Sequence, residues 1–262
     1  MKLKYIVTAI GLTFIPLQLQ ANVITFDAFA NGEVISNQVA GVEISADNIN
    51  SSRDWAAIYS SLSAGGEDTD LEGPSWGNSN ITGIDSMSFG NLLIIQESNG
   101  FGSADTTGDE GCAAGVCLNP DDEGRRSAGS LIFEFDEAID SFGFDLFDVE
   151  DVEHGNGYVA TFFDKSGQSV ANIGFGEFAS GGLYDVGAIW GDNSVNRISP
   201  MDFTGMGVRK VELAFGGSAA VDNVSFSFTT AIPEPFTLPL LTIGLLGLLQ
   251  ASRKQNKVKS VV

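Results

Sequence analysis

The chain has 262 residues with 34 acidic and 13 basic side chains, which gives a formal net charge of −21 at pH 7. An acidic surface repels nucleic acids and anionic lipids, so we exclude both as binding partners of the folded part. Hydrophobic residues make up 43% of the chain, which is enough to bury a core and excludes disorder throughout.

The N-terminus has the layout of a secretory signal peptide. Lys2 and Lys4 precede an apolar run over residues 5–19, and Ala21 is a small residue at the expected cleavage position. An uncleaved anchor is the alternative, but the apolar run is short for a membrane span. We therefore predict a signal peptide over residues 1–21, cleavage after Ala21 and export through the inner membrane.

Residues 22–230 have the pattern of one all-β domain. Short alternating runs recur between Gly, Asn and Asp turns, and no segment carries a convincing helical stripe, which favours a β-sandwich of jelly-roll type. Residues 22–232 hold 33 acidic and only 7 basic side chains, a balance that attracts calcium or simply keeps the domain soluble. The predicted strands are residues 23–26, 39–45, 86–90, 92–96, 131–135, 141–147, 158–163, 169–175, 208–215 and 222–228.

The two cysteines, Cys112 and Cys117, lie in a long Gly- and acid-rich loop over residues 98–130. Their spacing does not fit a redox CxxC pair, and no His or second Cys pair is near enough for a zinc site. In an exported protein the pair is expected to form a disulfide. Long loops in compact domains are often functional.

Two aspartates extend apolar rows at strand ends. Asp148 shares the parity of the inward row at 142, 144 and 146, and Asp222 shares that of 224, 226 and 228. A buried carboxylate must be paired, hydrogen-bonded or bound to metal. The pattern therefore fits either rim carboxylates bonded to turn amides or a structural calcium site at the sandwich edge.

Two loop segments also have calcium-ligand spacing. Asp68-Thr69-Asp70-Leu71-Glu72-Gly73 and the stretch 119–124 both resemble the first half of a calcium-binding loop. Both have a serine where the loop requires its final glutamate. Solvated acidic loops are the alternative for each segment.

Catalytic patterns are scarce, and we expect a protein that is not an enzyme. His154 is the only histidine, which excludes multi-histidine zinc sites and argues against a catalytic triad. A glycosidase with paired carboxylates is the alternative that the acidic composition leaves open. Exposed aromatic rings can stack on sugar faces, so Trp55, Trp76 and Trp190 are candidate glycan-binding residues, with packing in the core as the alternative.

Three elements follow one another at the C-terminus: Pro233-Glu234-Pro235, an apolar run over residues 236–249, and the basic pair Arg253 and Lys254. In this order they resemble the PEP-CTERM sorting signal of exported Gram-negative proteins. The resemblance implies a sorting signal over residues 231–262 with a transmembrane helix at 236–252, whose basic end stays in the cytoplasm. It also implies recognition and cleavage by an exosortase and a link to extracellular polysaccharide. An ordinary tail anchor is the alternative.

A second resemblance concerns the domain itself. The segments 24–27, 142–148 and 221–226 look like those of PEP-CTERM proteins with a jelly roll similar to carbohydrate-binding modules. That resemblance implies one calcium ion shared by Asp27 and Asp222, and strand parity adds Asp148 as a third candidate ligand. Calcium is thus the candidate cofactor.

The sequence therefore predicts a cell-surface or matrix protein that an exosortase sorts and that is associated with extracellular polysaccharide or biofilm. Before processing, the C-terminal helix anchors the chain in the inner membrane. The alternative function is a calcium-assisted carbohydrate-binding module.

Overall fold

The structure is a computed structural model that describes residues 21–49, 54–62, 69–74, 76–96, 112–122, 126–150, 152 and 157–229. The predicted signal peptide up to residue 20, the sorting signal, its helix at 236–252 and His154 lie outside the described residues. Within the described ranges, no helix has both the length and the apolar character that a membrane crossing requires.

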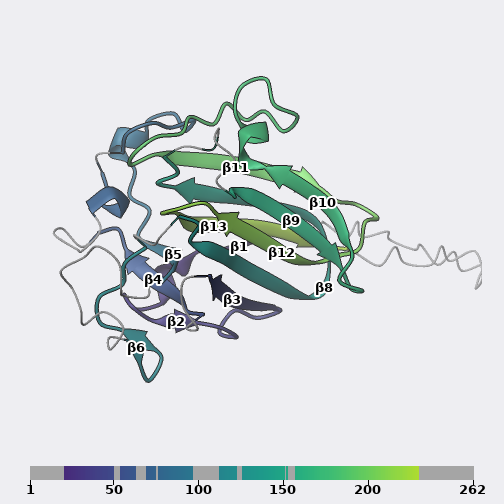
Figure 1. The fold of residues 1–262 in the computed structure, drawn as a ribbon, viewed down its shortest axis with the longest axis horizontal. Coiled ribbons are helices and arrows are strands. Elements are labelled where there is room, and N and C mark those ends of the chain that lie inside the picture. Colours follow the sequence, from purple (N-terminus) through teal and green to yellow (C-terminus); the bar gives the residue numbers. More distant parts are fainter. Residues whose placement is uncertain are drawn as a thin grey trace, which may run out of the picture. The chain divides into compact units, whose positions relative to one another are not determined.

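The described residues form an all-β fold consistent with a β-sandwich. Eleven strands join in one large antiparallel sheet, and β6 and β7 form a separate hairpin (Figure 1). The strands are β1 (Asn22–Ile24), β2 (Val34–Ile35), β3 (Val42–Asn48), β4 (Ala56–Ser60), β5 (Asn91–Ile95), β6 (Cys112–Ala113), β7 (Val116–Cys117), β8 (Gly129–Phe147), β9 (Val159–Asp164), β10 (Ser169–Gly174), β11 (Val195–Asp202), β12 (Val208–Phe215) and β13 (Ala220–Phe228). Short 3-10 helices are η1 (Phe26–Ala28), η2 (Thr69–Leu71), η3 (Ile84–Ser86) and η5 (Phe175–Phe178).

Strand β8 belongs to both layers of the fold. Its first half pairs with β3 and β12, and its second half pairs with β11 and β13. Phe133 and Phe135 in the first half have ring centroids 5.8 and 6.2 Å from that of Phe142 in the second half. The two halves of one strand therefore face each other across the core, so the sheet folds over on itself.

A second, smaller core covers the other face of the sheet near β4 and β5. Trp76 and Phe89 come from the segment between these strands and pack edge-on against Phe147 of β8. This end of the sheet is therefore buried on both faces. Side chains of either parity are buried there.

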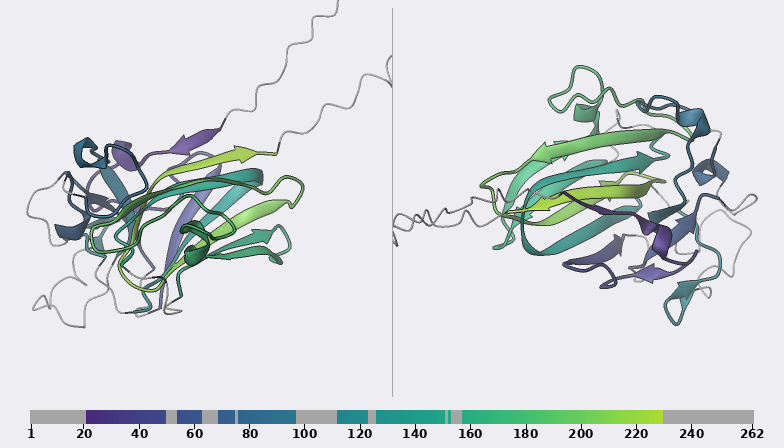
Figure 2. Two further views of the ribbon diagram at one scale, coloured as in Figure 1. Left: turned by 90° about the horizontal axis from the view of Figure 1, so that it is seen from above. Right: turned by 180° about the vertical axis from the view of Figure 1, so that it is seen from behind.

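The first and last strands are neighbours. Asn22 of β1 pairs with Phe226 of β13, and Ile24 pairs with Val224 (Figure 2). Because the pair is antiparallel, the start of β1 and the end of β13 lie at the same end of the domain. The compact unit that carries the sheet ends at Thr229, whose amide donates to the carbonyl of Ala138 at 2.7 Å.

The predicted strands agree with the structure in most places and fail in three. The predicted pair 131–135 and 141–147 is the single strand β8. Residues 86–90 form no strand, since η3 ends at Ser86 and the following residues lead into β5. Strands β2, β4, β6, β7 and β11 were not predicted, because none of them alternates apolar and polar residues over a long enough run.

Candidate functional site

The predicted calcium ligands divide between two places in the fold. Asp27 and Asp222 lie together where β13 exchanges one neighbour for another. Val221 of β13 pairs with β5, whereas Val224 pairs with β1. Asp222 stands between these two pairings. Asp27 lies in η1, and its Oδ1 accepts a hydrogen bond from the backbone amide of Asn91 at 3.0 Å.

A β-bulge changes the face on which Asp222 lies. The register of β13 on β8 shifts between Asp222 and Ser225, and Asn223 has φ 49°. Asp222 therefore pairs directly with Asp145 and leaves the inward row of Val224. The prediction that Asp222 extends that row is wrong, although Asp222 is buried, with 2% of its surface exposed.

The surroundings of Asp222 disfavour the ionised form of its carboxyl group. Its pKa is raised to about 7, chiefly by burial and also by the charges of Asp145 and Asp27, while the backbone amides of Asn223 and Phe26 act in the opposite direction. Its Oδ1 is buried without a hydrogen-bond partner. Asp27 and Asp222 are thus close enough for their charges to interact, as a shared cation site requires.

Asp148 lies in a different acidic cluster. Carboxylate oxygens of Asp70, Asp148 and Asp192 all lie within 4.8 Å of one another. Asp148 has φ 53° just after β8 and accepts the amide of Asn193 at 2.7 Å. Oxygen ligands at 2.3–2.6 Å from a calcium ion are separated by distances of this order. The parity prediction for Asp148 and the predicted loop at 68–73 thus each contribute one residue to the same cluster.

This cluster lies at the opposite end of the domain from the start of β1 and the end of β13. Phe147, just before Asp148, pairs with Ala220 at the start of β13, whereas Ser141 pairs with Ser227 near its end. Asp68, the first residue of the predicted loop, lies outside the described residues.

An ion pair that sequence reasoning missed adjoins Asp222. The buried carboxylate of Asp145 accepts from Nε and Nη2 of Arg197 at 2.7 and 2.6 Å and from Nδ2 of Asn223 at 2.9 Å. The three residues line a cleft of about 260 Å³ together with Val23 and Pro200. Strand parity placed Asp145 on the outer face, and no sequence signal identified its partner in the unpredicted strand β11.

The three candidate tryptophans differ in exposure. Trp76 is buried, with 4% of its surface exposed, so the expectation that its ring is available to a sugar is corrected. Trp55 and Trp190 are half-buried. The ring of Trp190 stacks on that of Phe175, with an interplanar angle of 24° and centroids 6.4 Å apart.

The predicted disulfide is confirmed. Cys112 and Cys117 are bonded and close the β6–β7 hairpin. The amide of Cys117 donates to the carbonyl of Gly32 at 2.6 Å, and the amide of Val34 donates to the carbonyl of Gly115 at 2.8 Å. The bridge therefore shapes a hairpin that is docked on the segment before β2.

The second predicted calcium loop, at 119–124, is partly described. The carbonyl of Asn119 accepts from the Gln96 amide at 3.2 Å, and Gln96 Oε1 in turn accepts from the Asp121 backbone at 3.4 Å. Gln96 thus fixes the start of this loop beside the end of β5. Glu123 lies outside the described residues.

No protein-family model matches the chain, and no curated protein matches it.

Proposed function

We propose that this chain is an exported cell-surface or matrix protein whose C-terminal segment is a sorting signal for an exosortase. The folded domain is its cargo, in association with extracellular polysaccharide. We further assign the sandwich to the jelly-roll type and a transmembrane helix to residues 236–252.

The pairing of β1 with β13 is the observation that carries this proposal. Strand β1 begins at Asn22, directly after the predicted cleavage site, and β13 ends at Phe228, five residues before Pro233. The strand that follows the export signal and the strand that precedes the sorting signal are thus side by side (Figure 2). A domain tethered by either end would present the same face to the membrane.

The sequence after β13 suits a processing site. Pro233 and Pro235 have no backbone donor and favour an extended chain, the form in which proteases bind their substrates. Because Thr229 is the last residue of the compact unit, the motif begins only four residues beyond it. The protease would therefore act close to the end of the domain at which β1 begins and β13 ends.

Mass spectrometry of the protein from a host with an exosortase tests the proposal. We expect a mature N-terminus at Asn22 and loss of the segment after the Pro-Glu-Pro motif. Replacing Glu234 with Gln should leave the tail attached, while Glu177→Gln, an exposed change in η5, should be processed normally. A wild-type chain that keeps Val262 in such a host would contradict the proposal.

Calcium-assisted glycan binding is the second candidate. The grouping of Asp70, Asp148 and Asp192 favours it, because it supplies three carboxylates at calcium spacing. Asp27 and Asp222 supply a second pair. At either place the carboxylates would bind the ion directly.

Thermal unfolding with calcium or with EDTA tests this candidate. A native-state ligand at 100 times its Kd stabilises by about 2.7 kcal/mol, so a tight site raises the Tm clearly. Asp192→Asn should remove the increase if the ion binds at the three-aspartate cluster, and Asp27→Asn should remove it if the ion binds beside Asp222. Equal melting temperatures with calcium and with EDTA would exclude a tight site.

A further inference from the structure

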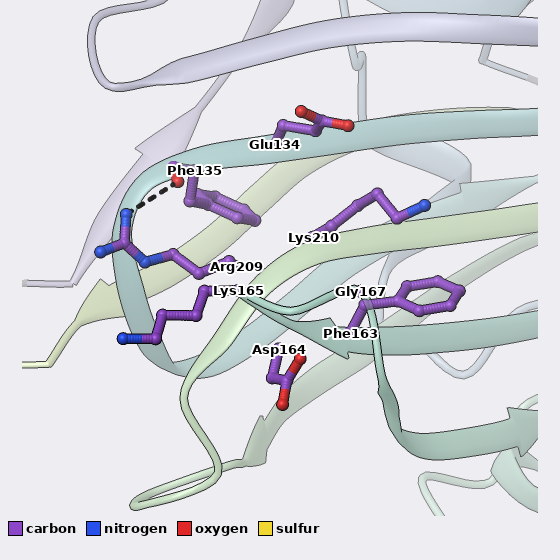
Figure 3. A pocket seen from close by; sticks show the side chains of 8 residues that line it. All are labelled: Glu134, Phe135, Phe163, Asp164, Lys165, Gly167, Arg209 and Lys210. Carbon is purple, nitrogen blue, oxygen red and sulfur yellow. Dashed lines mark hydrogen bonds between the residues drawn. The ribbon is translucent and has the colours of Figure 1, made fainter.

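One surface hollow gathers an unusual share of the few cations in this acidic domain. Residues 22–232 contain seven basic side chains against 33 acidic ones. Three of the seven, Lys165, Arg209 and Lys210, line a single hollow of about 400 Å³ (Figure 3). It lies between the β9–β10 turn, the start of β12 and the bend of β8. Two acidic residues, Glu134 and Asp164, line the same hollow.

Two of these cations are held in place. Arg209 is 32% exposed, and its Nη1 donates to the carbonyl oxygens of Phe135 and Asp136. Its Nη2 pairs with the exposed carboxylate of Glu137 at 3.3 Å, a kind of surface pair that contributes little and that a bound anion can replace. Lys210 is 30% exposed, and its Nζ lies 4.1 Å from the ring centroid of Phe163 and 3.6 Å from Oε2 of Glu212. Half-buried charges that are already ordered are less screened by salt and lose less entropy on binding an anion.

The third cation stands at the rim. Lys165 is exposed in the turn between β9 and β10, which Gly167 completes at φ 79°. The acid in this turn, Asp164, is engaged in its own loop. Its Oδ1 accepts from the Ser166 hydroxyl at 2.6 Å and from the Gln168 amide at 3.0 Å, and these bonds lower its pKa.

The surroundings of the hollow select a small anionic group over a broad anionic surface. Asp136 and Glu137 are exposed beside Arg209, and Glu134 lines the hollow itself. A flat negative surface would meet these carboxylates together with the cations. A single carboxylate can reach the ammonium and guanidinium groups without bringing further negative charges against these acids.

We propose that this hollow binds the carboxylate of an acidic sugar, so that the ligand class is a uronate-containing polysaccharide. The inference rests on the proposed function, since it names the kind of polysaccharide with which the exported domain associates. Arg209 and Lys210 form the ordered base of the site, and Lys165 lies at its rim in the β9–β10 turn.

Calorimetric titration of the full-length protein with a galacturonic acid hexamer tests the inference. A neutral glucose hexamer is the matched ligand. We expect the acidic hexamer alone to bind, and the Lys165→Gln/Lys210→Gln variant to lose roughly tenfold or more in affinity. Arg126→Gln should bind as wild type, because Arg126 is exposed, pairs with Glu150 and does not line the hollow.

Three results would overturn the inference. They are no binding of the acidic hexamer, equal binding of the neutral one, and unchanged affinity in the Lys165→Gln/Lys210→Gln variant with an unchanged Tm. The hollow and the end of β13 lie at the same end of the domain. Phosphatidylglycerol vesicles are therefore included as a further ligand. Vesicle binding without hexamer binding would assign the site to phospholipid and also overturn it.

This experiment is independent of sorting. Tail removal is scored by mass spectrometry in cells, whereas sugar binding is scored on purified protein. Loss of one result with retention of the other therefore identifies which proposal has failed.

Discussion

Arg197 and Asp145 are directly opposite each other on β11 and β8, and both carboxylate oxygens of Asp145 accept from the guanidinium group. Asp145 is 1% exposed, while Arg197 keeps half of its side chain in solvent. The pair allows a charged side chain to lie within the second half of β8. Without it, an ionised carboxylate would lie beside Asp222 in a buried position.

Replacing Arg197 with Met should destabilise the domain by about 2 to 3 kcal/mol, because Asp145 would keep only the Asn223 amide as a side-chain donor. The exposure of Arg197 places the cost below that of a fully buried pair. Urea denaturation measures it, with Arg126→Met as the matched change in an exposed pair. If Arg197→Met lowers the free energy of unfolding equally in wild type and in an Asp145→Asn background, the two residues are not energetically coupled.

The raised pKa of Asp222 predicts an unusual pH dependence. Its folded-state pKa of about 7 exceeds the ordinary value of 3.8, so the native state binds more protons than the unfolded state between these pH values. The free energy of unfolding should therefore fall as pH rises from about 4 to about 7, by roughly 4 kcal/mol from this group. Below that window the carboxyl is protonated in both states.

Asp222→Asn should remove this decrease, as measured by denaturant unfolding at pH 4.5 and 7.5. Asp164→Asn is the control, because hydrogen bonds lower the pKa of Asp164 and give it the opposite sign. Parallel curves for wild type and Asp222→Asn would contradict the assignment.

Gly90 and Asp27 should be coupled through space. Gly90 has φ 68°, and a Cβ built on it would lie 1.9 Å from Oδ1 of Asp27. Gly90→Ala should therefore cost more than the roughly 1–2 kcal/mol of the left-handed backbone alone. Gly83→Ala isolates the backbone cost, since Gly83 has φ 77° and open space around its Cβ position. In an Asp27→Ala background, the two glycine substitutions should cost the same.

The centre of the core should be sensitive to Phe142. Its ring contacts those of Phe133, Phe135, Phe144 and Phe162, and the side chain is fully buried. Phe142→Ala should lower the free energy of unfolding by about 3 to 5 kcal/mol. Phe163→Ala, at a half-buried ring, should cost clearly less in the same urea titration. A similar cost for both would mean that the two halves of β8 do not pack as described.

Removing the disulfide should have a modest effect. Cys112 and Cys117 are five residues apart, and the chain-entropy relation gives about 2 kcal/mol for so small a loop. Thermal unfolding of Cys112→Ser/Cys117→Ser measures this loss. Dithiothreitol should lower the Tm of wild type to a similar extent and leave the double variant unchanged.

Much of the fold could be predicted from local pattern. The period-two runs that become β3, β12 and β13 are evident because one face of each is apolar. The disulfide followed from two closely spaced cysteines in a chain whose sequence predicts export. Strand β11 could not be predicted in this way, since Pro200 and the charged residues Arg197 and Asp202 interrupt its sequence and its place depends on pairing with β8.

The candidate site shows the same division. The sequence by itself determined that Asp148 and Asp222 adjoin apolar runs, and both are buried, although the bulge takes Asp222 off the row of Val224. Only the tertiary structure decided their partners. The bulge at Asn223 moves Asp222 opposite Asp145, and the turn after β8 brings Asp148 to Asp70 and Asp192. Strand parity records the direction of a side chain along one strand, whereas partners depend on register and on loops that are distant in the sequence.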